Sequence, residues 1–528
     1  MNSYIKTLFP LFPFVFCFLT NLPAKAAERI YFNYGLLGFS VSVNSLATFA
    51  EEGKIDKELA FYLKRLQPQQ RSQFRDFLRS RYKVNSLTVY RFSRTSVGEK
   101  LLNKIGDFIQ IPGGRNGFYG VRGAVVQSAS DPQGINVITL LRNFPTDIQL
   151  NTSEIIKLVK QFSHLDRESK NFIDSLAQIP QENGNSQEIK NLEKLPNLAQ
   201  SGSFNIEQQT IEFLDQIRQR KLIVDFYLPQ GVKQAPLIFI SNGINANRNR
   251  FKYLAEYLAS NGFAIAIPDH PGSNERRHQA FLSGLYSENF DAQEFINRPL
   301  DITYLLDRIE QINQSRFNNQ LNLQQVGIFG YSFGGTTALA LAGAKIDFQQ
   351  LEKDCNSQVN PINISILYQC RILELPRETI NTINLEDKRI KAAFVFVPFG
   401  KSIFGKTGMS RITIPIFWQA ADQDLITPLL LEQIPSFSWL TNQEKYLVIS
   451  QKLPHALITL GSTTDSNDLT KVREIIKTYL NTLSLVFFKV HVAQEEQYRP
   501  YLQASYLRHI SQKPYTLNLI REIKRIEE

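Results

Sequence analysis

Cysteine, histidine, methionine and tryptophan are scarce in this chain, which has three, six, two and two of them among 528 residues. These counts exclude a disulfide-rich scaffold and a protein built around cysteine-bound metal clusters. The formal net charge is +10, yet like charges never run for five residues, as they do in many nucleic-acid-binding proteins. We therefore expect no nucleic-acid partner, and at most a weak peripheral contact with an anionic membrane surface.

Long apolar runs are also absent beyond the first 26 residues, so no membrane-spanning helix is expected. Residues 1–26 place Lys6 before an apolar run at 7–22 and end in Ala24-Lys25-Ala26, the small-x-small pattern of a cleavage site. A spanning helix is the alternative, but the run contains two prolines and is too short. We expect a signal peptide cleaved after Ala26 and export to the periplasm or the exterior.

Export would decide which cysteines the mature chain keeps and whether they are oxidised. Cys17 would leave with the signal peptide, and the mature chain would keep Cys355 and Cys370. In an oxidising compartment this pair predicts a disulfide, which the chain-entropy model values at about 3 kcal/mol. Two buried free thiols are the alternative. Because no histidine lies near either cysteine, no zinc site is expected there, and we expect neither a metal nor another cofactor.

The length and the changing pattern of the chain predict several segments. Residues 27–150 indicate a smaller, mainly helical domain with a short β entry, in which Ser96 and Glu99 form a capping box. Residues 151–215 indicate a helical segment and a polar linker, and residues 481–528 a helical tail. In residues 216–480, β-branched runs alternate with amphipathic helices, which predicts an α/β fold with a mostly parallel sheet and helices on both faces.

The expected strands and helices of that sheet domain are short. The strands are predicted at 222–227, 237–241, 264–268, 325–329, 392–397, 414–419 and 445–449, and helices at 251–260, 298–312 and 336–342.

The sharpest motif is G-Y-S-F-G at residues 330–334. It follows a predicted strand and precedes an alanine-rich helix, the context in which a strained turn presents a nucleophilic serine. Ser332 would be that nucleophile. A structural turn without catalysis is the alternative, because a bare G-x-S-x-G arises often by chance.

A nucleophilic serine requires a base and a group that orients the base. His455, His491 and His509 follow Ser332 in the chain, and His455 is favoured because it lies in a loop just beyond a predicted strand. Asp424 is favoured as the orienting acid over its neighbour Asp422, because it has the usual position before a proline. The order serine, acid, histidine matches the order that this arrangement requires.

An oxyanion hole needs two backbone N–H groups. One is expected from Phe333, directly after the nucleophile, and the other from Ile244, in the loop after strand 237–241. That loop contains Asn242 and Gly243, and the glycine would let the chain turn closely.

Two further sites are expected to be structural. His270 could line a pocket, but we favour a role in stabilising its loop. Arg298 is expected to pair with Asp269 or Asp301, and Pro299 to lie near the first position of a helix.

Residues 222–460 resemble the α/β-hydrolase superfamily, in particular its platelet-activating-factor acetylhydrolase and dienelactone-hydrolase-like branch. The matching stretches are 241–243, 251–260, 269–274, 297–301 and 330–335. The whole mature chain resembles a group of hydrolases known chiefly from cyanobacteria, with an N-terminal domain of unknown function, through residues 27–30, 95–102 and 112–119. The resemblance implies serine-ester hydrolysis without a metal or cofactor, and short acyl groups on a lipid-like alcohol. Asn242 departs from the histidine common at that position.

The leading hypothesis is therefore an exported serine esterase or lipase acting on an ester or lipid-like small molecule. Residues 346–387, with both mature cysteines, would form a lid insertion. Its apolar side chains would either face an acyl chain or be buried, namely those of Ile364, Ile366, Leu367 and Tyr368. A non-catalytic binding or scaffold protein on a hydrolase fold is one alternative. An acyltransferase that uses an alcohol in place of water is another.

Overall fold

The structure is a computed structural model that describes residues 26–178, 196–356, 362–455 and 467–523. The predicted signal peptide lies, apart from Ala26, outside the described residues, and so does most of the predicted linker. The described chain divides into two compact units. Of the described residues, the first comprises 26–89 and Leu102–Ile155, and the second comprises Tyr90–Leu101 and those from Ile156 to 523.

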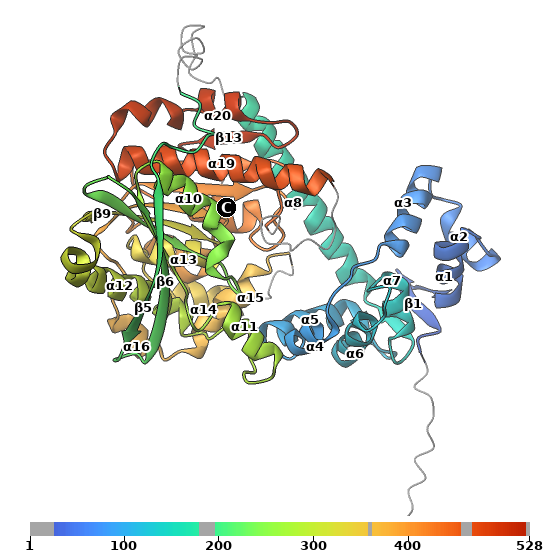
Figure 1. The fold of residues 1–528 in the computed structure, drawn as a ribbon. Helices are drawn as coiled ribbons and strands as arrows, with labels where there is room; N and C mark the ends of the chain where they lie inside the picture. Colours follow the sequence, from blue (N-terminus) through green and yellow to red (C-terminus); the bar gives the residue numbers. More distant parts are fainter. Residues whose placement is uncertain (1–25, 179–195, 357–361, 456–466, 524–528) are drawn as a thin grey trace, which may run out of the picture. The chain divides into compact units, whose positions relative to one another are not determined.

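The first unit is mainly helical, as predicted, with a small sheet in the strand order β2-β1-β4-β3 (Figure 1). Side chains from both parts of the sequence, including Phe49, Leu102 and Phe144, share one core. The elements are β1 (Arg29–Tyr34), β2 (Leu37–Ser42), α1 (Val43–Glu52), α2 (Lys57–Leu63), α3 (Pro68–Arg79), β3 (Ile109–Gln110), α6 (Phe118–Ala129), α7 (Val137–Arg142) and β4 (Ile148–Leu150).

Two helices, α4 (Ser86–Phe92) and α5 (Ser96–Phe108), carry the chain from the first unit into the second and back. The sequence predicted Ser96 as the N-cap of this helix, in a capping box with Glu99, and this prediction is wrong by one residue. Ser96 is the first residue of α5, and the hydroxyl of Thr95 accepts a hydrogen bond from the Gly98 N–H at 3.0 Å. The N–H of Ser96 donates instead to Glu288 Oε1 at 2.7 Å.

The second unit is built on a nine-stranded sheet in the order β13-β12-β11-β10-β9-β7-β8-β6-β5 (Figure 1). The central strands from β8 to β12 are parallel, and β5, β6 and β13 are antiparallel to their neighbours. The strands are β5 (Ile206–Asp215), β6 (Arg220–Pro229), β7 (Ala235–Ser241), β8 (Ala264–Pro268), β9 (Leu321–Tyr331), β10 (Ile390–Phe396), β11 (Ile416–Ala421), β12 (Lys445–Ser450) and β13 (Leu517–Ile520).

The second unit contains helices that the sequence predicted and others that it did not. Together they are α8 (Thr152–Gln178), which begins in the first unit, α10 (Lys252–Ser260), α11 (Glu275–Leu282), α12 (Glu294–Phe317), α13 (Phe333–Leu341), α14 (Phe348–Asn356), α15 (Ser365–Gln369), α16 (Arg377–Thr382), α17 (Lys401–Met409), α18 (Ile434–Ser438), α19 (Asn467–His491) and α20 (Ala504–Ile510).

Three boundaries differ from the sequence prediction. The sheet begins at Ile206 rather than after residue 216, because β5 pairs with β6 along ten residues. The region after residue 480 adds β13 to the sheet and is not only helical. Helix α12 begins at Glu294, so Pro299 lies inside it and not at its first position.

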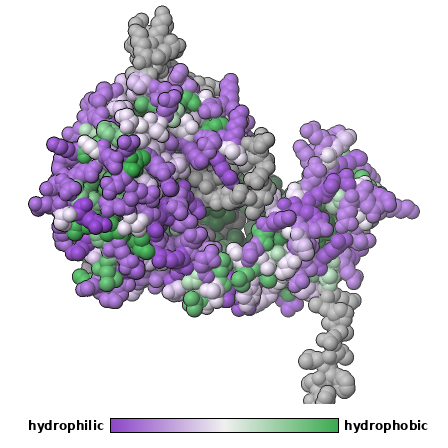
Figure 2. All heavy atoms as spheres, in the orientation of Figure 1, coloured by the Kyte–Doolittle hydropathy of each residue, from purple (hydrophilic) through white to green (hydrophobic). Residues whose placement is uncertain are grey.

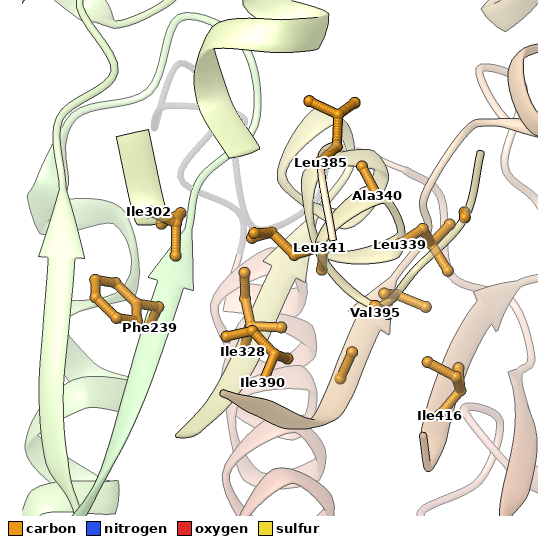
Figure 3. Packing of buried hydrophobic residues seen from close by; sticks show 14 of the residues in the cluster. Phe239, Ile302, Ile328, Leu339, Ala340, Leu341, Leu385, Ile390, Val395 and Ile416 are labelled. Carbon is orange, nitrogen blue, oxygen red and sulfur yellow. The ribbon is translucent and has the colours of Figure 1, made fainter. Parts of the chain in front are cut away.

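The predicted sheet with helices on both faces is confirmed by the packing of its core. Alternate residues of β7 point to opposite faces, and Phe239 and Ile238 belong to separate buried clusters. Phe239 packs on the side of α12 and α13, where Ile302 and Leu341 also lie (Figure 3). On the other face the sheet packs against α10 and α19. The sheet is therefore buried on both sides, as a parallel sheet requires.

The segment predicted as a lid insertion forms α14, α15 and α16 between α13 and β10. Cys355 and Cys370 are joined by a disulfide, which confirms the predicted pair. Within this segment Ile366 and Leu367 are buried in a small cluster with Cys370 and Val97. Whether the segment acts as a lid stays a prediction.

Hydrophilic side chains cover most of the face in Figure 2, with hydrophobic ones in scattered patches. Among the described residues, no helix has the length and apolar character needed to cross a membrane.

Candidate active site

Ser332 lies on the sharp turn between β9 and α13. Its backbone has φ 52° and ψ −117°, a conformation that residues with a β-carbon rarely adopt and that persists where the surroundings enforce it. Its N–H donates to the carbonyl of Phe396 on β10 at 2.9 Å. The turn thus holds the hydroxyl of Ser332 above the carboxyl ends of the central strands.

The motif glycines are required by close backbone contacts. A β-carbon on Gly334 would lie 1.8 Å from the carbonyl oxygen of Ser241, and one on Gly330 would lie 2.2 Å from the carbonyl oxygen of Gly334. Both distances are far below van der Waals contact. The glycines therefore let the turn pack against the end of β7.

His455 and Asp424 complete a chain of hydrogen bonds with the serine. His455 Nε2 lies 3.1 Å from Ser332 Oγ, and His455 Nδ1 lies 2.6 Å from Asp424 Oδ2. The Asp424 side chain is fully buried, and that of His455 is 11% exposed. The structure thus brings together the three residues that the sequence singled out, at the distances that a nucleophile, a base and an orienting acid would require.

Asp424 is held by its own loop. Its Oδ1 accepts hydrogen bonds from the N–H groups of Ile426 and Thr427, each at 2.8 Å, and its Oδ2 accepts one from the Thr427 hydroxyl at 2.6 Å. Asp422 lacks this arrangement: its buried Oδ1 has no hydrogen-bond partner among the described residues, and burial raises its pKa. The contact with His455 is made by Asp424.

The other histidines that follow Ser332 occupy different places. His491 Nε2 lies 3.2 Å from the hydroxyl of Tyr446, and the ring of His509 lies 6.5 Å from that of Tyr506. His455 is anchored near the nucleophile by Tyr331, whose hydroxyl donates to the His455 carbonyl at 2.9 Å.

The two predicted oxyanion donors lie on segments that contact each other. Phe333 is the first residue of α13, so its N–H makes no bond within the helix. A β-carbon on Gly243 would lie 3.4 Å from Ser332 Cβ, which places the loop after β7 against the nucleophile. Ile244 follows in that loop and is half-buried. Both donors stay predictions.

Asn242 stabilises its own loop. Its side chain is buried, and Nδ2 donates to the carbonyl of Asn247 at 3.2 Å. The amide thus closes the turn locally, which explains how this loop is ordered with an asparagine at that position.

A buried network of charges lies behind this loop. Asp301 accepts hydrogen bonds from Arg218 and, through both of its oxygens, from Arg220. His270 bridges Asp301 Oδ2 at 2.9 Å and the hydroxyl of Ser241 at 3.2 Å, and burial lowers its pKa. These contacts agree with the loop-stabilising role expected for His270.

Arg298 does not form the expected hydrogen-bonded pair with Asp269 or Asp301. Asp269 is bound by Arg248 and Arg276, and Asp301 by the arginines named above. Both partners of Asp301 lie more than 80 residues away in the sequence, so no local pattern could have assigned them.

Comparisons with known proteins agree with this architecture. Residues 236–351, from β7 to α14, match the family model described as the alpha/beta hydrolase fold. Residues 26–151 match a family described as an alpha/beta hydrolase of unknown function. Among curated proteins, none matches the chain significantly. Together with the sheet and the turn at Ser332, the first match shows that the second unit has the alpha/beta hydrolase fold.

Proposed function

We propose that this protein hydrolyses carboxylic esters through an acyl-enzyme formed on Ser332. One observation carries the proposal: Ser332 Oγ, His455 and the buried Asp424 form a continuous chain of hydrogen bonds of 3.1 and 2.6 Å. Such a chain makes a serine hydroxyl nucleophilic, since the histidine can accept its proton.

The first half-reaction would transfer the acyl group. Ser332 Oγ attacks the ester carbonyl while its proton passes to His455 Nε2, and the carbonyl electron pair becomes an oxyanion. Asp424 stays ionised and stabilises the histidine in its charged form. When the intermediate collapses, the alcohol leaves with the proton from His455.

The second half-reaction would release the acid. His455 takes a proton from water, the resulting hydroxide attacks the acyl carbon, and Ser332 leaves with its proton restored.

The substrate class we propose is an ester of a short acyl group with a lipid-like alcohol. The resemblance to the acetylhydrolase branch supports it.

The test uses p-nitrophenyl esters from acetyl to palmitoyl with the chain from Ala27. We expect turnover that is highest for short acyl groups and disappears in Ser332→Ala. A matched pair separates the two acids: Asp424→Asn should lower kcat by about 10⁴-fold, whereas Asp422→Asn should keep most of the activity. Full activity in Ser332→Ala would contradict the proposal, and inactivity of all variants and the unsubstituted chain on every ester would favour a binding role.

Transfer to an alcohol is the alternative reaction of the same acyl-enzyme. Adding methanol or glycerol to the assay distinguishes the two: a hydrolase releases mainly the free acid, while an acyltransferase produces mainly the new ester.

We also propose export of the mature chain, in line with its disulfide.

A further inference from the structure

Arg298 on α12 contacts both segments that carry the proposed oxyanion donors. Its Nη2 donates to the carbonyl oxygen of Asn242, in the loop after β7, at 2.6 Å. Its guanidinium carbon lies 4.6 Å from the ring centroid of Phe333. The residue is 1% exposed, so this cation is held between the loop and the start of α13.

The charge of Arg298 is not neutralised by a hydrogen-bonded acid. Glu294 and Asp301 are the acids whose charges interact most strongly with Arg298. Glu294, however, contacts Arg220 and Ser273. Within the described residues, Nε and Nη1 of Arg298 are buried without a hydrogen-bond partner. Burial lowers the pKa of Arg298 to about 10, which still leaves the group protonated at neutral pH.

A buried cation with two unpartnered nitrogen atoms is unfavourable by itself, because it loses its hydration without full compensation. Such a charge is favourable when an anion forms nearby in a poorly solvated site. The oxyanion of the proposed reaction would form beside Phe333, whose ring the guanidinium covers.

The residue that precedes Asn242 is also anchored. Ser241 is hydrogen-bonded to His270, which is held by Asp301. Arg298 holds the carbonyl of the next residue, Asn242, and so orients the peptide that joins it to Gly243. The N–H group of Gly243 belongs to this peptide, and that of Ile244 belongs to the next one.

We infer that Arg298 is a positioning residue for the oxyanion hole: it orients the loop after β7 through the Asn242 carbonyl and places a positive charge behind Phe333. This inference rests on the proposed ester hydrolysis. Removal of Arg298 should impair stabilisation of the tetrahedral intermediate more than binding of the ester.

The test compares Arg298→Met with Arg371→Met. Arg371 is the control because it is also buried, covers an aromatic ring (Phe290, at 4.4 Å) and donates to a backbone carbonyl, that of Phe290 at 2.7 Å. Its charge differs from that of Arg298 in being paired with Glu288 and Glu374. Both variants lose a buried cation, but only Arg298→Met loses the contact with Asn242. Titration with a fluorophosphonate that labels Ser332 gives the number of active sites in each preparation.

We expect Arg298→Met to lower kcat per active site by about 10- to 100-fold, with KM changed by less than about threefold. A trifluoromethyl ketone inhibitor adds a readout that a purely structural role would not move. Ser332 Oγ bonds to its carbonyl carbon, the oxygen becomes an oxyanion, and the serine proton goes to His455. The inhibition constant should weaken by a factor similar to the loss in kcat. Arg371→Met should lower the melting temperature but keep kcat.

Arg298→Lys provides the second variant, because it keeps the charge with a single donor group. We expect its kcat and inhibition constant to fall between those of the unsubstituted protein and Arg298→Met, and it decides the question if Arg298→Met does not fold. Unchanged kcat and inhibition constant in these variants, or an equal loss in Arg371→Met, would overturn the inference while ester hydrolysis stands. If the unsubstituted protein neither hydrolyses esters nor reacts with the fluorophosphonate, the proposed function fails and the inference with it.

Discussion

Ser332 illustrates what single residues reveal in this chain. The G-x-S-x-G pattern, with a strand before it and a helix after it, predicted a strained serine, and the positive φ of 52° is that strain. The motif can be recognised in the sequence because contacts inside the turn and with Ser241 require glycine. A β-carbon on Gly334, for example, would lie 1.8 Å from the carbonyl oxygen of Ser241.

The partners of Ser332 were predictable from their order and their loops. The distinction between Asp424 and Asp422 depends on three hydrogen bonds from residues 426 and 427, which follow Asp424 at once in the chain. The role of Arg298 was not predictable, because its partners Asn242 and Phe333 come from two other elements.

His491 gives a prediction at the residue scale. Burial lowers its pKa to about 4, and it faces Tyr446, Glu444, Arg499 and Arg521. In the unfolded chain His491 keeps its ordinary pKa of about 6.5, so below that pH it binds a proton there while it stays neutral in the folded chain. Lowering the pH therefore favours unfolding. This residue should lower the free energy of unfolding by about 2 kcal/mol between pH 7 and pH 5.

Urea unfolding of the unsubstituted protein and of His491→Phe, at several pH values, measures the effect. The difference between the two proteins isolates this histidine from the other titrating groups. Equal pH dependence in both would contradict the prediction.

At the scale of elements, the central strands were predictable and the edges were not. Strands β7 to β12 are mostly apolar and buried along their central residues, because helices cover both faces of the sheet. Strand β5 contains Glu207, Gln208 and Gln209, which are half-buried or exposed and were attributed to a linker. An edge strand has one neighbour and tolerates polar residues, so the hydrogen bonds to β6 decide its structure.

The disulfide gives a prediction at the element scale. It joins α14 to the end of α15 across a separation of 15 residues, and such a loop stabilises a fold by about 3 kcal/mol through the entropy of the unfolded chain. The double variant Cys355→Ser with Cys370→Ser should therefore unfold at a lower temperature.

Thermal melts with and without a reductant provide the control. The reductant should bring the unsubstituted protein to the melting temperature of the double variant and leave that variant unchanged. A denatured mature chain with two titratable thiols before reduction would contradict the presence of the bond.

At the scale of the whole molecule, the first unit is discontinuous in sequence. The chain leaves it after Val89, contributes Tyr90–Leu101 to the second unit, and returns at Leu102. That segment is tied in by the bond from Ser96 to Glu288 and by Val97, which is fully buried in a cluster with Ile366 and Leu367. The sequence prediction placed one boundary at residue 150 and did not assign Tyr90–Leu101 to the second unit.

A substitution at Val97 tests the importance of this segment. Val97→Asp would place an unpaired charge in the cluster, which costs about 3 kcal/mol or more. Hydrogen exchange should then become faster in α15, where Ile366 and Leu367 lie. The control Val159→Asp, at a site that is 56% exposed, should leave α15 unchanged. Unchanged exchange in both variants would contradict the anchoring role.

The sequence by itself determined the class of fold and the three residues expected to react. Apolar periodicity follows from burial of each strand and helix, and a strained turn requires glycine at fixed positions, so both leave local patterns. Tertiary structure alone decided the edge strands, the crossing at Tyr90–Leu101 and the buried ion network, including Arg298. These depend on hydrogen bonds and charges between residues that meet only after folding, and a linear sequence does not display such pairs.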